Sequence, residues 1–190
     1  MEIILAENHG FCYGVKRAVE MANEAADGKG KSYTLGPIIH NPQVVGRLES
    51  KGVSPIQEVA DIDEGTMIIR SHGVGPAIYA EAEEKGLHIL DATCPHVKKA
   101  QQDAKSVIED GMTLVILGEK NHPEVKSINL WANNKGIIIE DEESAQKLQI
   151  VEKMGVVVQT TFSQFKFNSI IDILEKKSKN LKVFKTICNA

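Results

Sequence analysis

Short runs of β-branched and aliphatic residues alternate with amphipathic stretches along the whole chain. In the first stretch Val15, Ala18, Val19 and Ala22 recur at helical spacing, and Gly28 follows as a stop. This alternation predicts an α/β fold with small, mostly parallel sheets. Strands are predicted over residues 3–6, 33–36, 66–70, 87–90, 113–117, 136–139, 155–159 and 182–185. Helices are predicted over residues 15–26, 76–85, 95–109, 123–132, 142–148 and 163–177.

Segments of the second half of the chain resemble segments of the first half, in the same order. The pairs are L-G-P-I-I-H-N-P-Q-V from Leu35 with L-G-E-K-N-H-P-E-V from Leu117, I-I-R-S-H from Ile68 with V-V-Q-T-T from Val157, and L-H-I-L-D-A-T-C from Leu87 with L-K-V-F-K-T-I-C from Leu181. We therefore expect two similar α/β domains in tandem. The predicted division is an N-terminal strand and Cys12 loop in residues 1–13, a first domain in 14–94 and a second in 95–190.

Polar residues gather where the predicted strands end. These are His40, His72, Cys94, His122, Thr160 and Cys188. In open α/β sheets, ligands bind at the edge where the carboxyl ends of the strands meet the helix N-termini. One shared site is therefore expected.

Composition narrows the class of protein. The formal net charge is −4 and the isoelectric point is near 5.9, which argues against a nucleic-acid partner. No apolar run approaches the roughly 18 residues of a membrane span. The N-terminus has no secretory signal pattern, so a cytoplasmic location is expected.

The three cysteines, Cys12, Cys94 and Cys188, are too few and too scattered for a disulfide framework. In a reducing compartment, thiols spaced in this way are more often metal-binding or catalytic. Zinc and an iron-sulfur cluster are the two metal centres that three thiols could hold. A cubane cluster held by three thiols would keep one iron free to bind another ligand. The plainer alternative is that each thiol is a small buried apolar group.

Histidines and one acid are the other candidate functional groups. His40, His72 and His122 lie in predicted loops, where an imidazole donates to phosphate or binds a metal. Glu124 is either an ordinary acid in the first turn of a helix or a proton donor with a raised pKa. Its counterpart in the first repeat is Gln43. Thr160 is either a simple strand-end residue or a hydroxyl that orients a ligand. His88 is expected to be structural, and His9 and His96 receive no role.

The segments around these residues resemble a known family, 4-hydroxy-3-methylbut-2-enyl diphosphate reductase of the non-mevalonate isoprenoid pathway. The matching motifs occur in family order along the whole chain. They are G-F-C-Y-G-V, I-I-H-N-P, R-S-H-G-V, D-A-T-C-P, N-H-P-E-V, Q-T-T-F-S and T-I-C-N-A.

The resemblance implies an oxidoreductase that removes the hydroxyl of a diphosphate substrate with two electrons and two protons. It implies that Cys12, Cys94 and Cys188 hold a 4Fe-4S cluster, and that His40, His72 and His122 line the diphosphate pocket. Glu124 corresponds to the proton-supplying acid, and Thr160 to a threonine that orients the substrate. The implied products are isopentenyl and dimethylallyl diphosphate, and the implied electron donor is a ferredoxin or flavodoxin.

The resemblance also implies three similar domains around the cluster, the third with a serine- and asparagine-rich diphosphate motif. No segment of this chain matches that motif, so the chain is expected to correspond to the N-terminal two-thirds of the family's length and to bind substrate weakly. The rival hypothesis from the residues alone is a non-catalytic zinc-binding module or an electron carrier.

Overall fold

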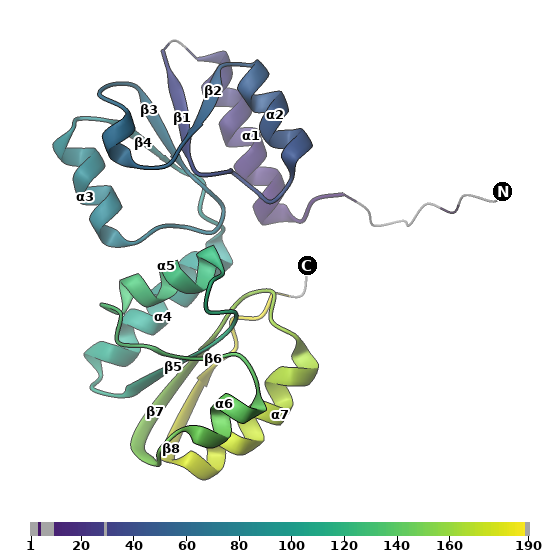
Figure 1. The fold of residues 1–190 in the computed structure, drawn as a ribbon, viewed down its shortest axis with the longest axis vertical. Helices are drawn as coiled ribbons and strands as arrows, with labels where there is room; N and C mark the ends of the chain where they lie inside the picture. The colour runs from purple at the N-terminus through teal and green to yellow at the C-terminus, as the bar shows by residue number, and fades with distance from the viewer. Residues whose placement is uncertain (1–3, 5–9, 29, 189–190) are drawn as a thin grey trace.

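The computed structural model describes residue 4, residues 10–28 and residues 30–188. Two α/β units follow one another along the chain, each built around a four-stranded sheet of parallel strands. In Figure 1 the first unit runs from purple to teal and the second from teal-green to yellow. The predicted fold class, tandem α/β units with small parallel sheets, is confirmed.

The first unit has strand order β2-β1-β3-β4, with helices on both faces of the sheet. Ile68 packs with α1 and α2 on one face, whereas Met67 and Ile69 pack with η1 and α3 on the other. This alternation follows from the two-residue period of a strand. The elements are α1 (Tyr13–Asp27), β1 (Ser32–Leu35), α2 (Pro42–Ser50), β2 (Val53–Ile56), the 3-10 turn η1 (Val59–Asp61), β3 (Thr66–Ile69), α3 (Pro76–Glu84) and β4 (His88–Asp91).

The second unit repeats this plan with strand order β6-β5-β7-β8. Helices α4 and α5 cover one face of its sheet, and α6 and α7 cover the other. Ala100, Ala104 and Val107 form the buried side of α4 against the sheet. The elements are α4 (Pro95–Glu109), β5 (Thr113–Leu117), α5 (Pro123–Trp131), β6 (Ile137–Ile139), α6 (Glu142–Lys147), β7 (Val151–Val158), α7 (Gln164–Leu174), the 3-10 turn η2 (Glu175–Lys177) and β8 (Ser178–Phe184).

The register of the two sheets agrees with the repeat in the sequence. Leu35 lies beside Ile69 in the first sheet, and Leu117 lies beside Val158 in the second. In each sheet the chain reverses its direction of winding between the two central strands. Ligands of open α/β sheets bind beyond the carboxyl ends of the strands at such a switch point. The loops after β1 and β3, and after β5 and β7, are therefore the favoured places for a site.

Some elements differ from the sequence-based expectation. Strand β2 was not predicted, because its four residues carry no regular pattern and include Pro55 on the edge of the sheet. Strand β7 begins earlier than predicted, since Val151 pairs with Ser178 of β8. The long helix predicted over residues 163–177 ends at Leu174 and continues as a 3-10 turn. The strand predicted over residues 3–6 lies, apart from Ile4, outside the described residues.

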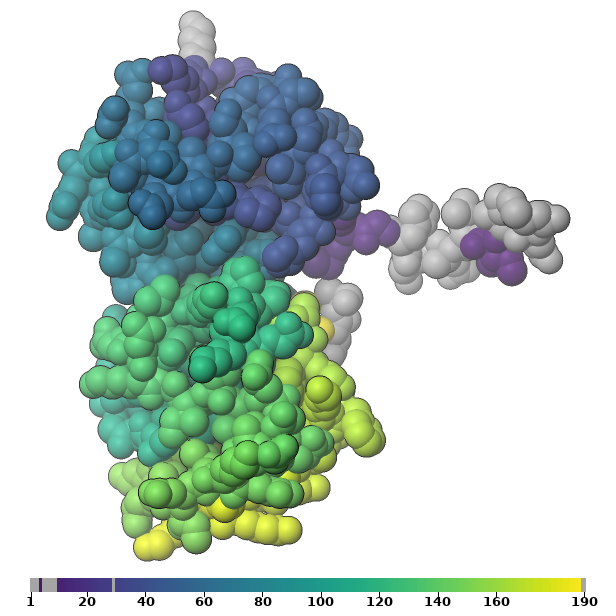
Figure 2. Space-filling view, viewed as in Figure 1, coloured from purple at the N-terminus to yellow at the C-terminus, as the bar shows by residue number. Residues whose placement is uncertain are grey.

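The two units meet at a waist (Figure 2), and α5 lies there against the loops of the first unit. The indole Nε1 of Trp131 donates to the carbonyl oxygen of Val74 at 2.9 Å. The hydroxyl of Ser127 lies 2.8 Å from the carbonyl oxygen of His72. Helix α5 of the second unit therefore holds the loop after β3 of the first unit in place. In the described part of the chain, no helix is long and apolar enough to cross a membrane.

Candidate active site

Three imidazoles from both units face one another at the waist. His40 follows β1, His72 follows β3 and His122 precedes α5. Their ring centroids are 4.4 Å apart for His40 and His72, 5.7 Å for His40 and His122, and 5.4 Å for His72 and His122. Each ring comes from a switch-point loop. The convergence expected from strand-end placement is therefore present for all three histidines.

His122 has a defined hydrogen-bonding role because it caps α5. Its Nδ1 accepts a hydrogen bond from the backbone N–H of Glu124 at 3.2 Å. A ring nitrogen that accepts a hydrogen bond carries no proton, so the neutral ring carries its proton on Nε2. The free Nε2–H is thus a donor. A donor suits an anionic oxygen better than a metal ion, which needs a lone pair.

Burial lowers the pKa of two of the three histidines, His72 and His122. The pKa of His72 falls to about 3, first because the ring is buried and then because His40, His122 and Arg70 add positive charge nearby. Burial also lowers the pKa of His122, with a further contribution from His40. Among the residues that the structure describes, the buried Nδ1 of His72 has no hydrogen-bond partner. This nitrogen of His72 is therefore available to a ligand, as a donor or as an acceptor according to the tautomer of the ring.

A buried acid lies next to the imidazoles. Glu124 is 2% exposed, and its carboxylate accepts hydrogen bonds from the backbone N–H of Thr160 at 2.6 Å and from its hydroxyl at 2.9 Å. Burial raises the pKa of Glu124, although both bonds from Thr160 act to lower it. A carboxyl with a raised pKa can carry a proton near neutral pH. Glu124 therefore has the environment of a proton donor rather than that of a surface helix acid.

The two later thiols occupy equivalent places in the two sheets. The backbone N–H of Cys94 donates to the carbonyl oxygen of Ser71 at 2.9 Å, and that of Cys188 donates to Thr160 at 2.8 Å. Ser71 and Thr160 are matching positions of the repeat. Cys12 and Cys94 directly precede α1 and α4, and neither thiol is used as a cap. The positive end of a helix dipole suits a thiolate there.

All of these groups border a single cavity of about 220 Å³. The cavity also brings in residues that the sequence analysis did not select, above all His96 and Ser71. Ser71 had a detectable signal, since it matches Thr160 in the repeat. His96 had a weaker one in the likeness between C-P-H-V-K-K-A and C-Y-G-V-K-R-A, the starts of α4 and α1. The predicted residues on its wall are Cys12, His40, His72, Cys94, His122, Glu124, Thr160 and Cys188.

The ligand atoms of the imidazoles and those of the thiols differ in how closely they gather. Within the described ranges, the three imidazoles are the group whose ligand atoms all lie within 4.8 Å of one another, and the three thiols do not form such a group. Thiolates around a single zinc ion, with Zn–S bonds of about 2.3 Å, lie about 4 Å apart. The three free thiols border one cavity, but they are not gathered closely enough to be the ligands of a single zinc ion as they stand.

The fold and the site thus define an α/β protein with a thiol-lined cavity, a buried acid and imidazole donors, as in a metal-dependent enzyme acting on an anionic substrate. The LytB protein family matches residues 3–190. The chain is 48% identical over 190 residues to 4-hydroxy-3-methylbut-2-enyl diphosphate reductase of Geotalea uraniireducens. The alignment covers all of this chain and 67% of that protein. The chain belongs to the LytB family.

Solved structures agree with this assignment. A structure of (E)-4-hydroxy-3-methyl-but-2-enyl diphosphate reductase, the terminal enzyme of the non-mevalonate pathway, matches with a TM-score of 0.88 and 44% identity, over 98% of this chain and 68% of the other. The reductase from Plasmodium falciparum matches with a TM-score of 0.91 and 31% identity, over 97% of this chain and 60% of the other. The chain thus spans about two-thirds of its relatives' length.

Proposed function

We propose that this chain carries the reductive dehydroxylation of 4-hydroxy-3-methylbut-2-enyl diphosphate, the substrate in the names of its relatives. Two electrons and two protons enter, the C–O bond breaks, and water leaves with isopentenyl or dimethylallyl diphosphate as product. The observation that carries the proposal is the buried Glu124–Thr160 pair, which shares one cavity with three free thiols and three imidazoles.

The diphosphate lies against His40, His72 and His122 in this proposal. Support comes from the tautomer of His122, which directs an N–H donor away from the helix, and from the unpartnered Nδ1 of His72 in the described structure. The positive charge of Arg70 also acts on His72 and His122. Hydrogen bonds from nitrogen donors to an anion are among the stronger ones in proteins.

Cys12, Cys94 and Cys188 hold the 4Fe-4S cluster in the proposal. When bound, the cluster supplies electrons and an open iron with Lewis-acid character. The chain's own contribution is the proton. Burial favours the protonated form of Glu124, and the hydroxyl of Thr160 fixes the direction of its carboxyl group. The electron donor is a ferredoxin or flavodoxin.

A domain division goes with this function. Residues 14–94 and 95–190 each hold one sheet, and the cavity lies where the two meet. This division is supported by helix α4, which follows Cys94 at once and packs on β5 and β7 of the second sheet.

The test is an anaerobic assay of the reconstituted chain with a chemical reductant and the diphosphate substrate. Glu124→Gln should lower turnover by about 100-fold or more, the scale of general-acid catalysis. Glu84→Gln, a change of an exposed acid at the end of α3, is the control and should leave turnover unchanged. Equal rates for the Glu124 variant and the unaltered chain would contradict the proposed role of this acid. A chain without any turnover would contradict the activity itself.

A further inference from the structure

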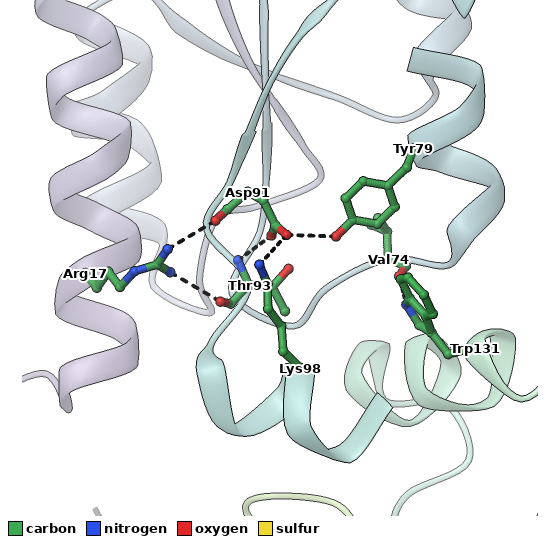
Figure 3. A network of polar contacts seen from close by, with 7 residues as sticks. All are labelled: Arg17, Val74, Tyr79, Asp91, Thr93, Lys98 and Trp131. Carbon is green, nitrogen blue, oxygen red and sulfur yellow. Dashed lines mark hydrogen bonds and ion pairs between the residues drawn. The ribbon is translucent and has the colours of Figure 1, made fainter. Parts of the chain in front are cut away.

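Side chains from three helices hold the segment that leads into Cys94 (Figure 3). From α1, Arg17 donates through Nη1 to the carbonyl oxygen of Thr93 and through Nη2 to that of Asp91, both at 3.3 Å. The carboxylate of Asp91 receives Lys98 of α4 at 2.6 Å and the hydroxyl of Tyr79 of α3 at 3.0 Å. It also accepts the backbone N–H of Thr93 at 2.9 Å. Side chains of α1, α3 and α4, which lie outside β4, therefore hold this segment in place.

Helix α1 also touches the Cys94 thiol. A Cβ added to Gly14 would lie 2.6 Å from the Sγ of Cys94, closer than any real contact allows. Gly14 and Arg17 are three residues apart, so they share one face of the helix. The same helix begins directly after Cys12. Helix α1 therefore follows the Cys12 thiol directly and makes two separate contacts with the segment that ends at Cys94.

We propose that Arg17 is a positioning residue that fixes the Cys94 thiol relative to the Cys12 thiol. This inference rests on the proposed function, in which both thiols are ligands of the cluster. Arg17 borders neither the substrate cavity nor the reacting groups, and it acts through the backbone. The planar guanidinium suits this task because two of its N–H donors reach two carbonyls at once, which a single ammonium group on a flexible stem does less well.

The second repeat lacks this arrangement. Helix α4 begins with C-P-H-V-K-K-A where α1 begins with C-Y-G-V-K-R-A, so Lys99 occupies the place of Arg17. Lys99 instead pairs with Asp103 of its own helix, and its ammonium lies 6.0 Å from the ring of Phe184. A hollow of about 300 Å³ separates α4 from the segment before Cys188.

The segment before Cys188 is held by other means. The hydroxyl of Thr186 bonds both backbone groups of Val158, and Lys185 occupies the place of Asp91. Within the described residues, Arg17 forms hydrogen bonds with the segment before Cys94 and none with the segment before Cys188. Cys188 therefore serves as an internal control for the accessibility of Cys94.

The first experiment measures thiol alkylation in the cluster-free chain by mass spectrometry, cysteine by cysteine. Arg17→Gln should raise the rate at Cys94 by about tenfold relative to Cys188, the scale expected when hydrogen bonds from a charged group are lost. Lys16→Gln, the neighbouring exposed cation, should leave the ratio unchanged. An unchanged ratio in Arg17→Gln would overturn the inference.

Circular dichroism melting identifies a variant that fails to fold. If Arg17→Gln melts below the assay temperature, Arg17→Lys replaces it, since this variant keeps the charge and the packing of the stem. Arg17→Lys should give an intermediate Cys94 rate. A rate equal to that of the unaltered chain would again overturn the inference.

The second experiment follows anaerobic iron and sulfide uptake, then cluster loss during exposure to a chelator. The unaltered chain and Lys16→Gln should retain the cluster several times longer than Arg17→Gln. Failure of the unaltered chain to take up iron and sulfide would contradict the proposed function, whereas the alkylation ratio would still test Arg17. Equal retention in all three chains would contradict the role of Arg17 alone.

Discussion

The carboxylate of Glu124 and Thr160 form a two-point contact across the second unit. The backbone N–H of Thr160 donates to one carboxylate oxygen at 2.6 Å and its hydroxyl to the other at 2.9 Å. The acid comes from the start of α5 and the threonine from the loop after β7. These are the two switch-point loops of the second sheet, so the topology of the sheet brings the pair together.

The ionisation of Glu124 should be visible in stability. Burial raises its pKa in the folded state above the ordinary value of 4.5, so its contribution to stability is complete at low pH and is lost as the pH rises through the folded pKa. Glu124→Gln cannot ionise. Relative to the unaltered chain, its free energy of unfolding should therefore increase as the pH rises above the ordinary value of 4.5 in urea titrations. A constant difference across this range would show that Glu124 does not titrate with a raised pKa.

His72 should have the opposite pH dependence. Its pKa is lowered from 6.5 to about 3 by burial, with contributions from His40, His122 and Arg70. A histidine with a lowered pKa contributes stability that is present above pH 6.5 and is lost as the pH falls. His72→Gln should therefore reduce the loss of stability on acidification below that pH. His88→Gln, at an exposed strand position, is the control. Equal acid sensitivity in His72→Gln and the unaltered chain would argue against a buried neutral ring.

His122 both caps α5 and presents an N–H donor, and one substitution can separate these two roles. Asn41 caps α2 in the first unit by accepting the backbone N–H of Val44 at 3.0 Å. His122→Asn should therefore keep α5 capped while removing the imidazole donor. We expect calorimetry to show affinity for inorganic pyrophosphate reduced by about 10- to 100-fold, as for one lost hydrogen bond to a charged group. His122→Ala should in addition lose about 1 kcal/mol of stability. Unreduced affinity in His122→Asn would show that the anion binds elsewhere.

The close approach of α4 to β7 explains a glycine in the middle of a strand. A Cβ on Gly155 would lie 2.4 Å from one methyl of Val107 and 2.6 Å from the other. Gly155→Ala should cost about 1–3 kcal/mol through overpacking. Val107→Ala removes those methyls, so the double variant should be less destabilised than the sum of the two single variants. Additive losses would show that the helix relaxes away from the strand.

The sequence predicted the architecture because most strands are unbroken apolar runs, as at Thr113–Leu117, and because prolines mark helix starts, as at Pro95 and Pro123. It did not predict β2, whose edge position requires little apolar character. Boundaries such as the start of β7 depend on pairing with β8, which lies far along the chain. These features arise from tertiary contacts rather than from local pattern.

The candidate residues followed from strand-end placement and the repeat, but their environments did not. Sequence alone left Glu124 open as an ordinary helix acid, whereas its burial and its two bonds to Thr160 are properties of the folded chain. The two hydrogen bonds from Arg17 to the segment before Cys94 join residues that are 74 and 76 positions apart in the sequence. No local pattern encodes such a contact.

Mössbauer spectroscopy of the anaerobically reconstituted chain tests the central claim most directly. We expect about four iron and four sulfide ions per chain, with one iron whose signal differs from the other three and changes when the diphosphate substrate is added. Substitution of Cys12, Cys94 or Cys188 by serine should diminish this signal. Zinc without sulfide at the thiols, or a cluster with no distinct iron and no response to the substrate, would contradict the account.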